Sequence, residues 1–151
     1  KWRGMIGDLA MREDELLGKT LVIVGMGAIG SRLARFAKAF DMRVLATKRD
    51  PSTAIGPADE VVTPDRLSDL VPQADFLALT CPLTPETTNI VDIGVLGAMR
   101  QTSYLINVAR GQCVDEPELV KALDSGEISG AGIDHFWEDP LGANSIGRAH
   151  V

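Results

Sequence analysis

Hydrophobic residues in this chain form short uninterrupted runs that alternate with amphipathic stretches. Residues 21–24 are an unbroken apolar run rich in β-branched side chains, which is typical of a strand buried on both faces of a parallel sheet. Runs of strand length recur at residues 44–46, 75–80, 104–108 and 128–133, with a brief one at 61–62. The intervening patterns predict helices at 31–40, 66–71 and 95–99, and a further helix that opens at 115–117 and ends at 125–126.

Strands that alternate with helices, over connections long enough for a crossover, predict an α/β fold with a doubly wound parallel sheet in three layers. We expect one domain over residues 1–151, with a linking helix at 2–11, a turn that ends at residue 18, and an irregular tail at 141–151. Residues 84–89 fit either the start of a helix or a loop. On the helix after the first strand, one face carries Ile29, Leu33, Phe36, Ala37 and Phe40. We expect that face to lie on the sheet.

A glycine turn joins the first strand to this helix. Gly25, Gly27 and Gly30 follow the strand directly in the spacing G-x-G-x-x-G. In that context the first glycine permits the sharp turn, the second lets main-chain amides approach a diphosphate, and the third lets the helix pack closely on the strand. Ala28 and Ile29 supply amides at the helix N-terminus, which attracts phosphate charge. The pattern predicts a Rossmann-type dinucleotide-binding domain.

Composition narrows the function by exclusion. The formal net charge is −6 and the sequence pI is about 4.8, which argues against nucleic acid or an anionic membrane as a partner. The two cysteines, Cys81 and Cys113, lie far apart in sequence without metal-ligand spacing, so we expect free thiols in a cytoplasmic protein and no metal site. The chain does not begin with Met, and we expect it to be either a domain excised from a longer protein or a processed chain.

Five motifs in a fixed order narrow the class of dinucleotide-binding protein. They are G-M-G-A-I-G at 25–30, C-P-L-T-P-E-T-T at 81–88, I-N-V-A-R-G at 106–111, V-D-E-P-E-L-V-K-A-L at 114–123 and D-H-F-W-E-D-P-L at 134–141. With these motifs the chain resembles the NAD(P)-binding domain of the D-2-hydroxyacid dehydrogenases. The resemblance implies an oxidoreductase that moves a hydride between the nicotinamide and a small 2-oxo or 2-hydroxy acid. It also implies a second, substrate-binding domain that is largely absent from this chain, and a homodimer formed through the nucleotide domain.

The resemblance assigns roles to individual residues. Arg110 matches the arginine that holds the substrate carboxylate and polarises its carbonyl, chemistry that suits a planar guanidinium. Asp134 matches the aspartate that contacts the nicotinamide carboxamide. Asp139 stands where the family usually carries a glutamate that orients the catalytic histidine, and it is shorter by one methylene. His150 is a candidate for that histidine, but in the family the histidine follows a proline further downstream, so its position is more typical of a tail residue. We interpret His135 as a packing residue.

The end of the second strand predicts which nicotinamide nucleotide binds. Members that use NAD carry an acid there for the ribose hydroxyls, whereas this chain has Lys48 and Arg49, which attract a 2′-phosphate, with Thr47 beside them. We therefore favour NADP over NAD, although Asp50 could still reach the ribose. The resemblance further places Cys81, Pro82 and Thr87 on the adenosine and ribose side and Val108, Ala109 and Arg110 on the nicotinamide side.

A second hypothesis is a dinucleotide-sensing binding protein without turnover, as the transcriptional corepressors of this family are. Binding of NADPH without reduction of any 2-oxo acid by the complete protein would favour it. A short-chain dehydrogenase is disfavoured because the Tyr-x-x-x-Lys pair is missing: the sole tyrosine is Tyr104, and Val108 stands four residues on.

Overall fold

The computed structural model describes residues 15–54 and 56–135. The strands are β1 (Thr20–Val24), β2 (Arg43–Thr47), β3 (Glu60–Val62), β4 (Phe76–Leu79), β5 (Tyr104–Asn107) and β6 (Gly130–Ile133). The α-helices of the described residues are α1 (Ala28–Ala39), α2 (Leu67–Leu70), α3 (Ile93–Ala98) and α4 (Glu116–Asp124). The expected linking helix at 2–11 and the tail at 141–151 lie outside the described residues.

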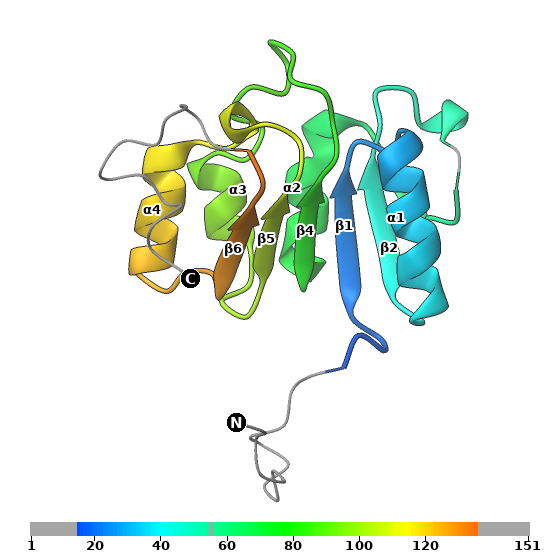
Figure 1. Cartoon of the computed structure of the whole chain (residues 1–151), viewed down its shortest axis with the longest axis horizontal. Helices are drawn as coiled ribbons and strands as arrows, with labels where there is room; N and C mark the ends of the chain where they lie inside the picture. The colour runs from blue at the N-terminus through cyan, green and yellow to red at the C-terminus, as the bar shows by residue number, and fades with distance from the viewer. Residues whose placement is uncertain (1–14, 55, 136–151) are drawn as a thin grey trace, which may run out of the picture.

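The six strands of the described residues form one parallel sheet in the order β3-β2-β1-β4-β5-β6, and the strands labelled in Figure 1 have their arrowheads at the same edge. The chain runs outward from β1 to β3, then returns to the other side of β1 and runs outward again from β4 to β6. The order therefore reverses between β1 and β4, which is the switch point of a doubly wound fold. The predicted fold class is confirmed.

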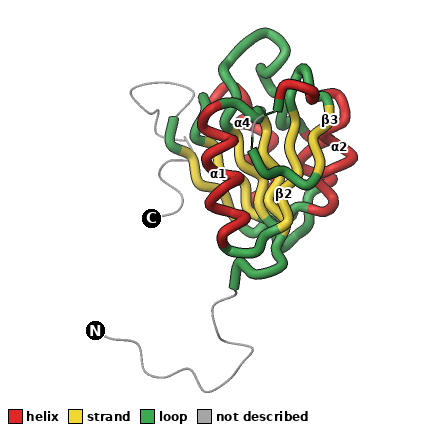
Figure 2. The backbone as a smooth tube through the Cα atoms, turned by 90° about the vertical axis from the view of Figure 1, so that its right-hand side faces the viewer, coloured by secondary structure: helices red, strands yellow, loops and turns green. Residues whose placement is uncertain are grey.

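Helices cover the two faces of the sheet unequally. Helix α1 packs on β1 and β2 from one side, where Ile23, Val44 and Ala46 are buried, and α2 lies on the opposite side (Figure 2). The larger core, with Leu77 and Leu105, lies on the side of α2, α3 and α4. Side chains of β5 that point the other way are exposed, so they are not covered by the described helices. Asp92 and Asp115 cap α3 and α4 by accepting hydrogen bonds from main-chain N–H groups of the first turn.

The prediction for the inner face of α1 is wrong for three of its five residues. Ile29, Phe36 and Phe40 are 58–63% exposed, whereas Ala37 is buried and Leu33 is partly buried against the core. The face that lies on the sheet is lined by small residues, namely Gly30, Ser31, Ala34 and Ala37. Small side chains let the helix approach the strands closely, and that close approach turns the bulkier apolar residues toward solvent. The apolar pattern of a helix does not contain the distance between that helix and the sheet. At a short distance only small side chains fit between them, whatever their hydrophobicity.

Candidate functional site

The residues expected at the site follow the strands in one row across the carboxyl edge of the sheet. Thr47, Val24, Leu79, Asn107 and Ile133 pair in register along neighbouring strands. The next residues in each strand direction are therefore adjacent in the fold; they are Lys48, Gly25, Thr80, Val108 and Asp134. This edge is where open α/β sheets bind their ligands, at the point where strand order reverses.

Two of the three glycines of the turn are required by the protein itself. Gly25 has φ +98°, and its Cβ would stand 2.8 Å from Cys81 Cα. Both the Gly25 and Met26 main-chain N–H groups donate to the Thr47 carbonyl, at 3.1 and 3.0 Å. A Cβ on Gly30 would stand 2.9 Å from Thr80 Oγ1, a hydroxyl that itself donates to the Gly25 carbonyl at 2.8 Å. Gly25 and Gly30 thus hold the strand, the turn and the helix together.

Gly27 differs from its two neighbours. It has φ −92° and ψ −157°, which any residue can adopt, and a Cβ built on it would meet no atom within 4 Å among the described residues beyond its chain neighbours. Packing within the described residues therefore gives no reason for a glycine here. The space beside it is open where a diphosphate would approach the main chain.

The N-terminus of α1 suits an anion. Among the described residues, no side chain caps it, and its first turn contains no acid. The first N–H groups of a helix have no partner within the helix and carry partial positive charge, so Ala28 and Ile29 present main-chain donors to this space. The residues present fit the diphosphate of a nicotinamide dinucleotide.

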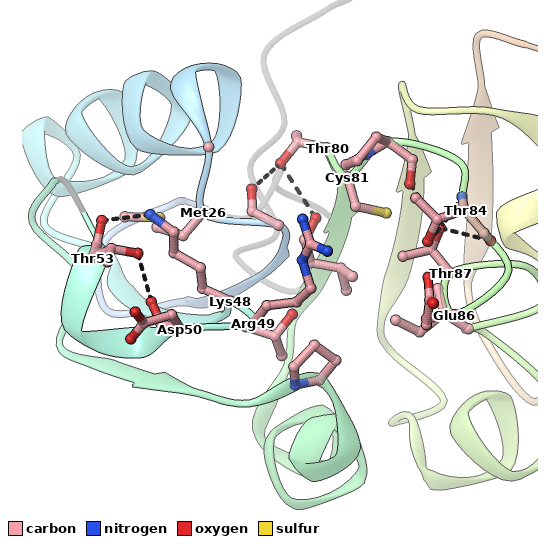
Figure 3. Close-up of a pocket in the computed structure, with 17 residues that line it drawn as sticks. Met26, Lys48, Arg49, Asp50, Thr53, Thr80, Cys81, Thr84, Glu86 and Thr87 are labelled. Atoms are coloured by element: carbon pink, nitrogen blue, oxygen red, sulfur yellow. Dashed lines mark hydrogen bonds between the residues drawn. The ribbon is translucent and has the colours of Figure 1, made fainter.

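A cavity of about 610 Å³ opens beside the turn, between the ends of β1, β2 and β4 (Figure 3). Its lining contains most of the residues expected on the adenosine side, namely Gly25, Gly27, Thr47, Lys48, Arg49, Cys81, Pro82 and Thr87. It also contains residues that the sequence analysis did not single out, among them Met26, Thr53, Pro64, Thr80, Thr84 and Glu86. Their common signal is position, because each lies on or near a segment that follows a strand of this edge.

Three neighbouring residues at the end of β2 have different partners. The Lys48 ammonium donates to the Thr53 carbonyl, across the short 3-10 turn Pro51–Thr53. The Asp50 carboxylate accepts from the main-chain N–H of Ser52 at 3.1 Å and from its hydroxyl at 2.6 Å, and so caps that turn. Arg49 instead extends its guanidinium toward the middle of the cavity (Figure 3).

The loop after β4 forms the opposite wall of the cavity. Residues 84–89 are a turn rather than a helix, because the N–H groups of Thr87 and Thr88 both donate to the Thr84 carbonyl and Asn89 has φ +52°. The Thr87 hydroxyl donates to the Pro82 carbonyl at 2.7 Å. Burial, with a smaller effect from the neighbouring Cys113 thiol, raises the pKa of the Cys81 thiol to about 12. Cys81 therefore meets the cavity as a neutral, slightly polar wall.

Arg110 lies at the same edge but outside this cavity. Asn107 is fully buried and holds the segment that presents it, accepting from the Ala109 N–H at 3.0 Å and donating to the Arg110 carbonyl at 2.8 Å. The Arg110 guanidinium donates to the Ala109 carbonyl at 2.7 Å and is otherwise accessible. The Asp134 N–H donates to the Asn107 carbonyl, which places Asp134 beside Val108. The residues expected on the nicotinamide side therefore lie next to the residues expected on the adenosine side.

The remaining candidates are only partly placed. Asp139 and His150 lie outside the described residues. His135 is half-exposed, with Nε2 3.7 Å from an Asp134 carboxylate oxygen. In residues 15–54 and 56–135, no group of three or more His, Cys, Asp or Glu side chains could hold a metal ion. No helix in those ranges combines the length and the apolar composition needed to cross a bilayer.

Comparisons with known proteins agree with this geometry. Residues 1–149 match the family model described as "D-isomer specific 2-hydroxyacid dehydrogenase, NAD binding domain". The chain is 42% identical over 146 residues to a glyoxylate reductase of Aeropyrum pernix, covering 95% of this chain and 43% of that protein. It is 41% identical over 133 residues to a D-3-phosphoglycerate dehydrogenase of Synechocystis, covering 87% of this chain and 24% of that protein.

Solved structures with a similar fold come from the same family. A crystal structure of a D-isomer specific 2-hydroxyacid dehydrogenase family protein from Aeromonas salmonicida superimposes with a TM-score of 0.84 at 30% identity, covering 96% of this chain and 44% of that one. The chain thus spans less than half the length of these relatives.

Proposed function

We infer the function from one premise: this chain belongs to the D-isomer specific 2-hydroxyacid dehydrogenase family, of which it is the NAD-binding domain. We propose that the complete protein is an oxidoreductase that reduces a small 2-oxo acid to the D-2-hydroxy acid, or oxidises the latter. The observation that carries this proposal is the turn at Gly27, which lies at the switch point of the sheet. There the main chain borders open space and is not covered by a side chain. A bound nicotinamide nucleotide supplies or accepts the hydride.

The chain's own residues bind and orient in this mechanism. The main-chain N–H groups of Ala28 and Ile29 would hold the diphosphate, and Asp134 would accept a hydrogen bond from the carboxamide of the nicotinamide. Arg110 holds the substrate carboxylate and polarises its carbonyl from the same edge. We assign Asp139 to orient a catalytic histidine that gives or takes the proton at the substrate oxygen, and His150 stays a candidate for it.

We propose that the nucleotide is NADP rather than NAD. Asp50, the acid that could have bound the ribose hydroxyls, already accepts two hydrogen bonds from Ser52. Arg49 extends a cation into the cavity where the 2′-phosphate of a dinucleotide on this edge would lie. Lys48 adds charge nearby while its ammonium donates to Thr53. We therefore assign the main phosphate contact to Arg49 and a supporting one to Lys48.

The wider setting follows from the same observations. We propose a homodimer through the nucleotide domain, because α1 exposes the apolar side chains of Ile29 and Phe36 along a shallow depression, and Phe40, which directly follows the helix, is exposed as well. A second domain outside this chain would complete the substrate pocket. We place the protein in the cytoplasm, a reducing compartment, because Cys81 and Cys113 are both free thiols.

Titration of the complete protein with NADPH and NADH tests the binding site, first in the wild type and then in a Lys48→Asp, Arg49→Ala variant. We expect tighter binding of NADPH, and loss of that preference in the variant. An unchanged preference would refute the assignment to the phosphate.

The catalytic proposal needs a separate variant. Arg110→Ala should abolish reduction of 2-oxo acids and leave nucleotide affinity unchanged, because Arg110 lies outside the nucleotide cavity. Retained turnover would refute its role. Tight nucleotide binding by a wild type that reduces no 2-oxo acid would instead favour a dinucleotide-sensing protein.

A further inference from the structure

One acidic residue in the wall of the cavity has no part in the function proposed above. Glu86 lies at the tip of the turn after β4 and lines the same cavity as Arg49, which reaches it from the end of β2 on the other side (Figure 3). The cavity is thus lined by a carboxylate as well as a guanidinium. A carboxylate is an unexpected choice in a site meant to hold a phosphate, since the two anions repel each other.

Glu86 belongs to a turn that two threonines close. The Thr87 hydroxyl donates to the Pro82 carbonyl at 2.7 Å and accepts the Thr84 N–H at 2.7 Å, and Thr84 Oγ1 lies 3.2 Å from Thr87 Oγ1. The Thr84 hydroxyl, then the Glu86 main-chain N–H and then the charge of Arg49 lower the pKa of the Glu86 carboxyl. Glu86 is consequently an anion at neutral pH.

Resting on the NADP assignment above, we propose that Glu86 is a specificity-determining residue: it is the counter-ion of Arg49 while no 2′-phosphate is bound, and it competes with that phosphate for the guanidinium. A nucleotide without the 2′-phosphate leaves the two charges as they are, on opposite walls of one cavity. A nucleotide with it brings two further negative charges into the field of the carboxylate. Glu86 thus weakens the binding of NADPH but not that of NADH. It thereby reduces the difference in affinity between the two nucleotides that Arg49 produces.

Replacement of the charge by an isosteric amide isolates this effect. In Glu86→Gln the dissociation constant for NADPH should fall by about two- to fivefold at low salt, the range expected for a dianion several ångströms from one carboxylate in a solvent-exposed site. The dissociation constant for NADH should stay within error of the wild type. The gain for NADPH should shrink at high salt, since ions screen the repulsion, whereas a purely steric effect of the substitution would not.

A matched control removes one negative charge far from the cavity. Asp124→Asn changes the exposed last residue of α4, which does not line the cavity, and should leave both dissociation constants unchanged. Glu86 is itself exposed, so its replacement should not alter the melting temperature. Glu86→Ala should give the same selectivity change without the amide.

Fluorescence titration of the complete protein with NADPH and with NADH decides among the outcomes. The preference for NADPH is measured as the dissociation constant for NADH divided by that for NADPH. A rise of this ratio in both Glu86 variants and not in Asp124→Asn supports the proposal. An unchanged or lowered ratio overturns it, even if wild-type protein prefers NADPH and Arg49→Ala abolishes the preference. If Arg49→Ala leaves the ratio unchanged, the NADP assignment fails, and the role of Glu86 falls with it.

Discussion

Substitution of Gly27 by alanine separates a glycine needed for a ligand from glycines needed for the fold. Gly27 has extended backbone angles that alanine adopts without strain, and its Cβ would enter open space. Gly25, two residues earlier, has φ +98° and a Cβ position only 2.8 Å from Cys81 Cα. The same change at these two positions should therefore have opposite consequences for stability.

The expected magnitudes follow from these contacts. Gly27→Ala should stabilise the protein by up to about 1 kcal/mol, because alanine lowers the entropy of the unfolded chain. In the folded protein the new methyl group keeps the diphosphate from the main-chain donors. Loss of one or two charge-assisted hydrogen bonds should cost about 2–4 kcal/mol, or roughly 30- to 1000-fold in affinity. Gly25→Ala should destabilise the fold by about 2–4 kcal/mol through its positive φ and its clash.

Two measurements on each variant suffice, namely the melting temperature without nucleotide and the dissociation constant for NADPH. Gly97→Ala is the matched control, since Gly97 lies in α3, away from the cavity, and its Cβ would also meet no atom within 4 Å. It should bind NADPH like the wild type and melt slightly higher. Wild-type affinity in Gly27→Ala would show that the ligand does not approach the main chain there. A large loss of stability in that variant would mean that Gly27 serves the fold.

Further predictions concern residues around the site. Asp59 accepts from the Val44 N–H at 2.8 Å and from Lys38 at 2.9 Å, interactions that lower the pKa of its carboxyl, so Asp59→Asn should cost about 1 kcal/mol at neutral pH in a denaturant titration. Because the pKa of Asp59 is lower in the folded state, its carboxylate stabilises the fold at pH values above the ordinary pKa of 3.8, and this stabilisation is lost as the pH falls below that value. The stability difference between Asp59→Asn and the wild type should therefore disappear in acid, and a difference that persists there would contradict the role given to Asp59. Cys113 is fully buried and does not line the cavity, so it should react with a thiol reagent only after unfolding; rapid labelling of Cys113 in the native protein would refute its placement. Asn107→Ala removes both hydrogen bonds of a buried amide and should lower the melting temperature by roughly 4–12 °C. A smaller shift would mean that the segment before Arg110 is held by other contacts.

The sheet could be predicted from sequence because a parallel strand buried on both faces needs an unbroken apolar run. Residues 21–24 and 76–79 are such runs, and both form central strands of the sheet. The position of the site followed from the fold, since strand ends in a parallel sheet meet at one edge. The glycine spacing then located the turn within that edge.

The orientation of α1 could not be predicted from the apolar pattern. Phe36 and Phe40 make an apolar stripe that fits a core-facing helix, yet the core-facing stripe is made of Ala34, Ala37 and Gly30. The distance between a helix and its sheet depends on three-dimensional packing, which the periodicity of one helix does not contain.

The interaction partners of the charged residues could not be predicted from the sequence either. Lys48 and Arg49 are adjacent cations in sequence, but only the structure shows that Lys48 closes a turn through Thr53 while Arg49 reaches the cavity. Glu86 enters the same cavity from a segment 37 positions further along the chain (86 − 49 = 37), so no local pattern connects it with Arg49. Pairings of this kind depend on the crossover between strands.

A crystal structure of the complete protein with NADP tests the central claim most directly. We expect the diphosphate to lie against the main-chain N–H groups of Ala28 and Ile29, with Gly27 in contact with it and the 2′-phosphate on Arg49. A nucleotide bound elsewhere on the molecule, or a turn at Gly27 that no ligand touches, would contradict it.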